Sequence, residues 1–134
     1  MDHFTELRGR VLALARVIDV PAHLLPTYRL SEGNGLPHLE IDGETYHYVH
    51  AERGTEHDRF STTSLDELLY LVFRDVAFSM AGRLAHPHQK PGQDFRREMF
   101  TQQLALLRRL NPEWESRCTA EHLDVLAKYP FVDE

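Results

Sequence analysis

Residues 46–81 read YHYVHAERGTEHDRFSTTSLDELLYLVFRDVAFSMA and contain the two patterns that decide the fold. At the start of this stretch the residue types predict a β-strand, whose side chains point alternately to opposite faces. From Ser64 onward, apolar residues surround the whole circumference of a helix, which is typical of a buried helix. Ser64 and Glu67 have the spacing of a capping box, in which each side chain bonds a free amide at the helix start. We therefore expect a central buried helix over residues 64–84.

Two antiparallel strands are predicted before this helix, at residues 38–41 and 45–51. Asp42-Gly43 separates them and favours a two-residue hairpin turn, because glycine tolerates positive φ. Alternation places Tyr46, Tyr48, His50 and Glu52 on one face of the second strand and His47, Val49 and Ala51 on the other. Both faces are partly apolar, so this strand is expected near the centre of a small sheet. Shorter strands are predicted at residues 27–30, before a loop at 31–35, and at residues 58–62, after a turn at 52–55.

Further helices are predicted at residues 4–18, 94–110 and 119–129, with Pro112 at the first position of a helix of its own. A polar linker at residues 85–92 reverses the chain because it contains two prolines. Arg96 or Arg97 is expected to pair with an acid such as Glu52 or Asp75, and Phe131 to hold the tail against the body. The fold class expected is α+β: a small antiparallel sheet of three to four strands packed against about four to five helices, one central and buried.

The chain length of 134 residues suits one domain, which we expect to span residues 1–134. No segment approaches the roughly 20 apolar residues of a membrane span, and the N-terminus does not have the pattern of a secretion signal. Cys118 is the single cysteine and has no partner for an intramolecular disulfide. It is interpreted as a small helix residue, and a reducing cytoplasm is the expected location.

Acidic residues outnumber basic ones by 21 to 15, which gives a net charge of −6 and argues against binding nucleic acid through its phosphates. The excess is concentrated between Glu40 and Glu67, where eight acids face only Arg53 and Arg59. Any electrostatic partner of this region is therefore expected to be basic. The same acids are also consistent with an ordinary solvated face.

Nine histidines raise the question of acid–base or metal chemistry. His50 and Glu52 share a strand face, and with nearby His57 they form the candidate cluster of a small metal-independent hydrolase or ribonuclease. The alternative for these three is a set of polar residues on a partly wetted sheet face. His47 and His50 point to opposite faces, and residues 86–88 lack a third ligand at motif spacing, so no metal site is predicted. No phosphate-binding loop or nucleophile elbow is present, and only histidines distant in sequence are considered as bases for Cys118. No cofactor is expected.

Several short motifs together resemble a known family. They are Tyr46-His47-Tyr48-Val49, Glu52-Arg53-Gly54, Leu68-Leu69-Tyr70, Phe78-Ser79-Met80-Ala81, Asp94-Phe95-Arg96-Arg97 and Pro130-Phe131. The chain resembles the Immunity protein 63 family of bacterial polymorphic toxin systems over nearly its whole length. The resemblance implies a cytoplasmic protein that is not an enzyme and that binds and neutralises a cognate toxin domain.

The family resemblance assigns no toxin-contacting residue, so the contact surface is predicted from charge. We expect it at the acidic edge formed by Glu40, Asp42, Glu44, Glu56 and Asp58. These acids would meet cationic groups with which a nuclease toxin holds phosphate, and binding there would cover the toxin's active site. A regulatory or structural interaction module is the other non-enzymatic alternative. The sequence leaves the oligomeric state open.

Overall fold

The computed structural model describes residues 3–28, 36–53 and 55–134. It divides into two compact units, Met1–Val72 and Phe73–Glu134, and the boundary falls inside the long helix α2 (Leu65–Ala85). The remaining helices are α1 (His3–Val17), η1 (Ala22–Leu24), η2 (His86–His88), α3 (Phe95–Leu110) and α4 (Pro112–Lys128). The strands are β1 (Thr27–Tyr28), β2 (His38–Asp42), β3 (Thr45–Glu52) and β4 (Thr55–Thr62). This is the predicted α+β fold. Among the described helices none is long and apolar enough to cross a membrane.

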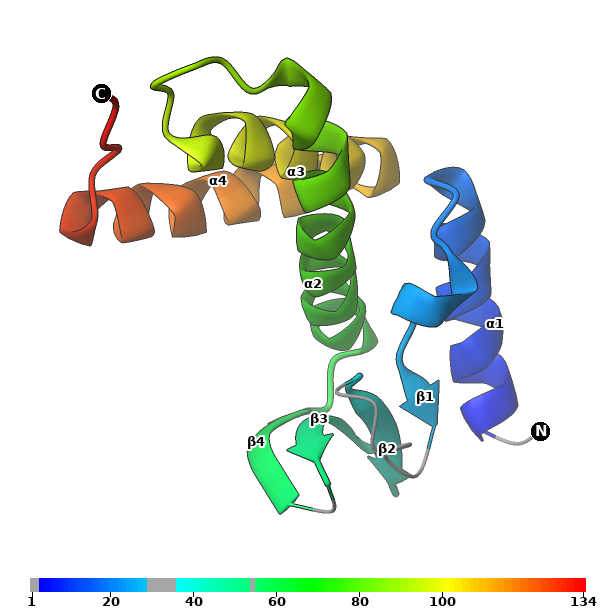
Figure 1. The fold of residues 1–134 in the computed structure, drawn as a ribbon. Helices are drawn as coiled ribbons and strands as arrows, with labels where there is room; N and C mark the ends of the chain where they lie inside the picture. Colours follow the sequence, from blue (N-terminus) through cyan, green and yellow to red (C-terminus); the bar gives the residue numbers. More distant parts are fainter. Residues whose placement is uncertain (1–2, 29–35, 54) are drawn as a thin grey trace. The chain divides into compact units, whose positions relative to one another are not determined.

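The strands form one sheet in the order β1-β2-β3-β4, which can be followed in Figure 1. β2, β3 and β4 pair antiparallel, as predicted. β1 instead pairs parallel to β2, so the sheet is mixed and not wholly antiparallel. The remaining residues of the predicted first strand, Arg29 and Leu30, and the predicted loop at 31–35 lie outside the described residues.

Two short turns set the register of the antiparallel strands. Asp42 pairs with Thr45, so the first loop consists of Gly43 and Glu44, one residue later than predicted. Gly43 has φ +61°, the positive value that the first central position of a hairpin turn requires. In the second turn Arg53 has φ +52°, and Gly54 lies outside the described residues. β4 starts at Thr55 and is longer than the strand predicted at 58–62.

A β-bulge interrupts the pairing of β3 with β4. His50 pairs with Asp58, whereas the next residue, Ala51, pairs with Glu56. His57 is therefore the extra residue on β4. Asp58, Phe60 and Thr62 lie on the sheet face of their partners His50, Tyr48 and Tyr46. Beyond the bulge, Glu56 lies on the opposite face, with its partner Ala51.

α1 contributes the apolar stripe predicted from its sequence. Leu7, Val11, Ala15 and, just beyond the helix, Ile18 are all buried. Phe4 on α1 places its ring edge-to-face with that of Tyr28, with 6.4 Å between the centroids. Figure 1 shows α1 beside β1 accordingly. Burial raises the pKa of Tyr28, against the opposing effect of Arg8.

The start of α2 is capped by Ser64, whose Oγ accepts a hydrogen bond from the amide of Glu67 at 3.1 Å. The amide of Ser64 donates to Oγ1 of Thr62 at 3.0 Å. Burial around the full circumference is confirmed for the six consecutive residues from Leu68 to Phe73. It does not extend along the whole helix, because Phe78 and Leu84 in the second half are 48% and 42% exposed.

In the second unit, α3 and α4 lie side by side and are joined at Asn111 (Figure 1). Asn111 ends α3 and caps α4, with its side chain accepting from the amide of Glu113 at 2.9 Å. Pro112 occupies the first turn of α4, as predicted. The helix then runs unbroken to Lys128, so the separate terminal helix predicted from residue 119 is wrong. Trp114 and Cys118, one turn apart, are both buried on one face of the helix, so the packed face already begins in its first turns. Trp114 also stacks on Phe73 of α2 at 6.3 Å.

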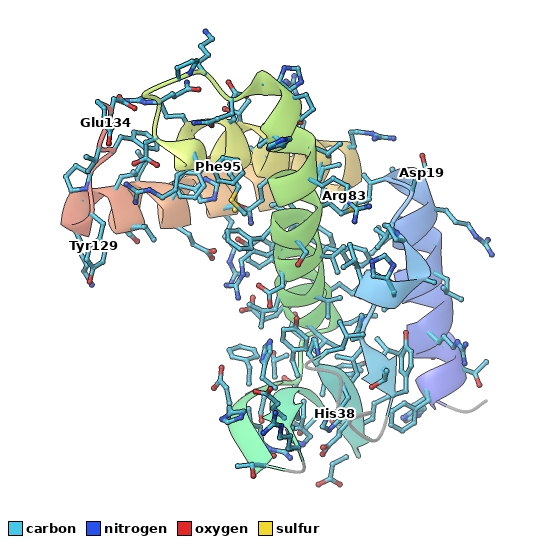
Figure 2. The ribbon with its side chains drawn as sticks, in the orientation of Figure 1. Asp19, His38, Arg83, Phe95, Tyr129 and Glu134 are labelled. Atoms are coloured by element: carbon cyan, nitrogen blue, oxygen red, sulfur yellow. The ribbon has the colours of Figure 1, made fainter. Side chains whose placement is uncertain are left out.

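The C-terminal tail turns back to the start of α3, as the positions of Tyr129 and Glu134 in Figure 2 indicate. Arg96 donates to the carbonyl oxygens of Tyr129 and Pro130, both at 2.8 Å, and pairs with Asp94. Arg97 pairs with Asp133 at 2.7 Å and covers the ring of Phe131. The predicted role of Phe131 is thus confirmed. The partners of the arginines are Asp94 and Asp133, in place of the acids suggested from the sequence, Glu52 and Asp75.

Candidate binding surface

An ion-pair network crosses the sheet at the predicted acidic edge. Arg59 on β4 places Nη1 3.1 Å from Oε1 of Glu40 on β2, and Nη2 2.7 Å from Oε1 of Glu56. On its other side, Glu40 accepts from Nε2 of His38 at 2.7 Å. The strand register explains this grouping, since Glu40 pairs with His47, Arg59 pairs with Val49, and His47 and Val49 share a face. Figure 2 labels His38 among the side chains of this sheet.

The network keeps its carboxylates ionised. Burial tends to raise the pKa of Glu40, but hydrogen bonds from His38 and Arg59 outweigh it and lower that pKa. The hydrogen bonds from Arg59 lower the pKa of Glu56. In return, the two carboxylates raise the pKa of Arg59. One arginine therefore compensates charge on two of the five predicted contact residues.

The other three predicted residues are placed differently. Asp42 ends β2 and Glu44 lies in the following turn, and both are exposed. Asp58 is exposed on β4 opposite His50, on the sheet face away from the Arg59 network. Within residues 3–28, 36–53 and 55–134, no ion pair involves these three acids. The structure thus brings Glu40 and Glu56 together and leaves Asp42, Glu44 and Asp58 exposed outside this network, with Asp58 on the opposite face of the sheet.

We define the acidic hairpin surface as the described residues 40–53 and 55–62, which together have a clear charge excess. It contains two arginines and six acids, which give it a formal net charge of −4: Glu40, Asp42, Glu44, Glu52, Glu56 and Asp58. The surface is also polar on the face of the Arg59 network, where Nδ1 of His47 lies 2.7 Å from Oγ of Ser61. Such a surface is suited to a cationic partner.

The candidate hydrolase cluster is spread along the same two strands. His50 packs its ring edge-to-face against Tyr48 on its own strand, with 4.8 Å between centroids. Its cross-strand neighbour is Asp58, whereas His57 is the extra residue of the bulge and Glu52 pairs with Thr55. In the described part of the chain, no group of three or more His, Cys, Asp and Glu side chains is arranged to hold a metal ion.

A second cluster of chemically active groups lies in the second unit. On α4, Sγ of Cys118 is 3.4 Å from Nε2 of His122, one turn further on. The same nitrogen is 2.7 Å from Oε1 of Gln103 on α3. Nε2 of Gln103 donates to the carbonyl of Arg74 at 3.0 Å, which orients the amide with its oxygen toward His122. A carbonyl oxygen only accepts, so Nε2 of His122 must carry the hydrogen.

This tautomer decides what the cluster does. A nitrogen that donates its hydrogen to Gln103 has no lone pair with which to take the thiol proton of Cys118. Burial also lowers the pKa of His122 and favours its neutral form, and the ring is stacked on Phe100 at 3.9 Å. The cluster borders a depression of about 450 Å³ whose wall includes Phe78, Met99 and Val125. We interpret the cluster as a structural link between α3 and α4.

The family model Immunity protein 63 matches residues 42–124. The chain belongs to the Immunity protein 63 family. Searches of curated proteins and of solved structures gave no match.

The segment matched to the Immunity protein 63 family contains β3, β4, α2 and α3 entire, together with most of α4. Four of the five predicted contact residues, all except Glu40, fall inside it. The match confirms the family resemblance over residues 42–124, and Pro130-Phe131, the last of the sequence motifs, lies outside it. Membership supports an immunity protein whose partner is a toxin.

Sequence reasoning missed the Cys118 and His122 pair in this Immunity protein 63 chain, because it considered only distant histidines. A spacing of four residues within a predicted helix would have placed the two side chains on one face. The link to Gln103 had no such signal, since it joins two helices across 19 residues of sequence.

Proposed function

We propose that this chain binds and neutralises a cognate toxin domain by covering its active site, and that the acidic hairpin surface makes the contact. Membership of the Immunity protein 63 family supports the toxin as partner. The observation that carries the choice of surface is the exposure of Asp42, Glu44 and Asp58 on the same strands and turn whose network already holds Glu40 and Glu56 in place. Chain 1–134 would act in the cytoplasm as one immunity domain, by binding and not by catalysis.

A nuclease is the toxin class that this surface fits best. Nucleases hold the phosphates of their substrate with lysine and arginine, and a rigid array of carboxylates competes for the same cations. The ion pairs of Arg59 fix Glu40 and Glu56 before binding, which reduces the side-chain entropy lost on association. The exposed acids at the turn and on β4 supply the uncompensated charge.

The test is co-expression with the cognate toxin domain, scored for cell survival and for complex formation. We expect the wild-type chain to protect and to co-purify with the toxin. A variant carrying Asp42→Lys, Glu44→Lys and Asp58→Lys should lose protection while keeping its thermal midpoint.

A matched control reverses three exposed acids elsewhere, Glu113→Lys, Asp124→Lys and Glu134→Lys, and changes the net charge by the same amount. This control should still protect. Equal protection by both variants would remove the acidic hairpin surface from the interface. Failure of the wild-type chain to bind or protect would overturn the toxin-binding function itself.

A further inference from the structure

β4 forms an unusually open edge of the sheet. It is the last strand in the order β1-β2-β3-β4, and each of its residues from 55 to 61 is exposed. The described residues place no strand beyond it. At the opposite edge, the described part of the chain includes only Thr27 and Tyr28 of β1. An edge of eight residues presents a row of backbone donors and acceptors long enough to pair with another strand.

The hairpin turns determine which backbone groups of β4 face outward. The two-residue loop makes Asp42 and Thr45 a hydrogen-bonded pair, so Thr45, His47 and Val49 direct their backbone groups to β2. The alternate residues Tyr46, Tyr48 and His50 then bond to β4, at Thr62, Phe60 and Asp58. Arg59 and Ser61 between them direct their N–H and C=O groups away from the sheet. Beyond the bulge, Glu56 pairs with Ala51, and its backbone N–H and C=O groups also point away from the sheet.

We propose that the toxin adds an extended strand with basic side chains to the outer edge of β4. The inference rests on the proposed function and specifies its binding mode, which is the addition of a strand to an exposed sheet edge. Main-chain bonds to Arg59, Ser61 and Glu56 give the register. The side chains of the added strand lie across the acidic hairpin surface.

The negative charge around β4 favours a basic strand as its partner. Residues 40–62 have six acids against two arginines, so two copies of this chain that met through β4 would each bring −4 to the contact. A strand rich in lysine or arginine gains from the same field. The bulge at His57 and the charges of Glu56 and Asp58 are devices that natural edge strands use against self-association. Phe60, 38% exposed on β4, offers an apolar contact to the partner.

Amide hydrogen exchange tests this binding mode residue by residue in the complex of the full chain with the toxin domain. We expect the amides of Arg59 and Ser61 to slow by at least about tenfold on binding, because they gain acceptors from the added strand. The amides of Asp58 and Phe60, already bonded to β3, should change much less. Such alternation along one strand distinguishes strand addition from simple coverage, which would slow neighbouring amides alike.

A pair of variants at one position tests the same bond by affinity. Ser61→Ala and Ser61→Pro both remove the contact of Oγ with His47, but only proline removes the outward N–H. We expect Ser61→Pro to weaken toxin binding about tenfold relative to Ser61→Ala. Thermal midpoints of the two variants show whether the fold is retained, and the exchange experiment on the unaltered chain needs no variant.

The outcomes separate the two proposals. A stable complex without the alternating protection of Arg59 and Ser61 would overturn strand addition and leave toxin binding intact. If no complex forms, the proposed function fails and the binding mode fails with it. A dimer of the chain alone, formed through β4 at micromolar concentration, would overturn the assignment of this edge to a basic partner.

Discussion

His122 donates the hydrogen on Nε2 to Oε1 of Gln103, and this 2.7 Å bond joins the buried faces of α4 and α3. Gln103 uses the other end of its amide to bond the carbonyl of Arg74 on α2. One glutamine, 3% exposed, therefore connects α2, α3 and α4. Several measurable consequences follow from this connection and from the acidic hairpin surface.

Replacing Gln103 by leucine should destabilise the protein by about 1–3 kcal/mol, because His122 loses its buried acceptor while the volume stays similar. Urea unfolding measures the loss. The control is Gln102→Ala at the preceding position of α3, whose side chain makes no hydrogen bond within the described residues, and it should change the free energy of unfolding by less than about 0.5 kcal/mol. Equal effects of the two changes would contradict the connecting role of Gln103.

His122 should make stability fall in mildly acidic solution. Its pKa is lower in the folded chain than in the unfolded chain, so the unfolded chain takes up the proton first as pH drops below about 6.5. Stability is complete above that pH and declines below it, by at most about 1.4 kcal/mol per pH unit. Urea midpoints between pH 7.5 and 5 measure this decline, and His122→Gln should reduce it.

The carboxylates titrate in a separate range. Glu40, Glu56, Asp94 and Asp133 all have lowered pKa values, so the stability they contribute is present above about pH 4 and is lost only below it. An unchanged slope between pH 7.5 and 5 in His122→Gln would therefore exclude His122 as its source.

Asp94 should control both the start of α3 and the order of the tail. Its Oδ1 accepts the capping bond from the amide of Arg96, and its Oδ2 accepts from the amide of Val132 at 2.9 Å. Hydrogen bonds from the Arg96 side chain and from these amides hold the pKa of Asp94 below its usual range. Asp94→Ala should lower the thermal midpoint and accelerate amide exchange at Val132. Asp94→Asn should have the smaller effect, since asparagine also caps helices well. Unaltered exchange at Val132 in the alanine variant would show that the tail is held by other contacts alone.

Association with the toxin should depend strongly on salt. If the acidic hairpin surface steers a cationic partner, raising the ionic strength from about 0.05 M to about 0.5 M should slow association by at least about tenfold. Stopped-flow fluorescence measures the rate. In the variant with Asp42, Glu44 and Asp58 changed to lysine, the wild-type acceleration at low salt should disappear. A rate independent of salt in the wild-type chain would argue for an apolar contact instead.

Local signals predicted most of the described elements. Ser64, Asp94 and Asn111 each cap a helix near the predicted start, because a capping side chain acts on amides two or three residues away. Gly43 placed the first hairpin to within one residue. The direction of β1, the tail partners of Arg96 and Arg97 and the bulge at His57 were not predicted. They depend on pairing between segments distant in sequence, which no local pattern contains.

Of the candidate surface, the sequence predicted the position of the acids but not their ion pairs. Composition alone located the acids of residues 40–62, and membership of the Immunity protein 63 family agrees with the kind of partner expected. That Arg59 would bind Glu40 and Glu56, while Asp42, Glu44 and Asp58 would stay outside this network, required the register of three strands.

The extra residue at His57 determines which face of the sheet the preceding residues of β4 occupy. Glu56 and Arg59 are three positions apart, and on a regular strand they would point to opposite faces. The bulge inserts one position between them, so both reach the face of Glu40. Deleting His57 would exchange the faces of every β4 residue before it and separate Glu56 from Arg59 without altering a single charge. A one-residue deletion would therefore change which charged side chains lie on each face of the sheet, while the composition and the net charge of the chain remain almost the same.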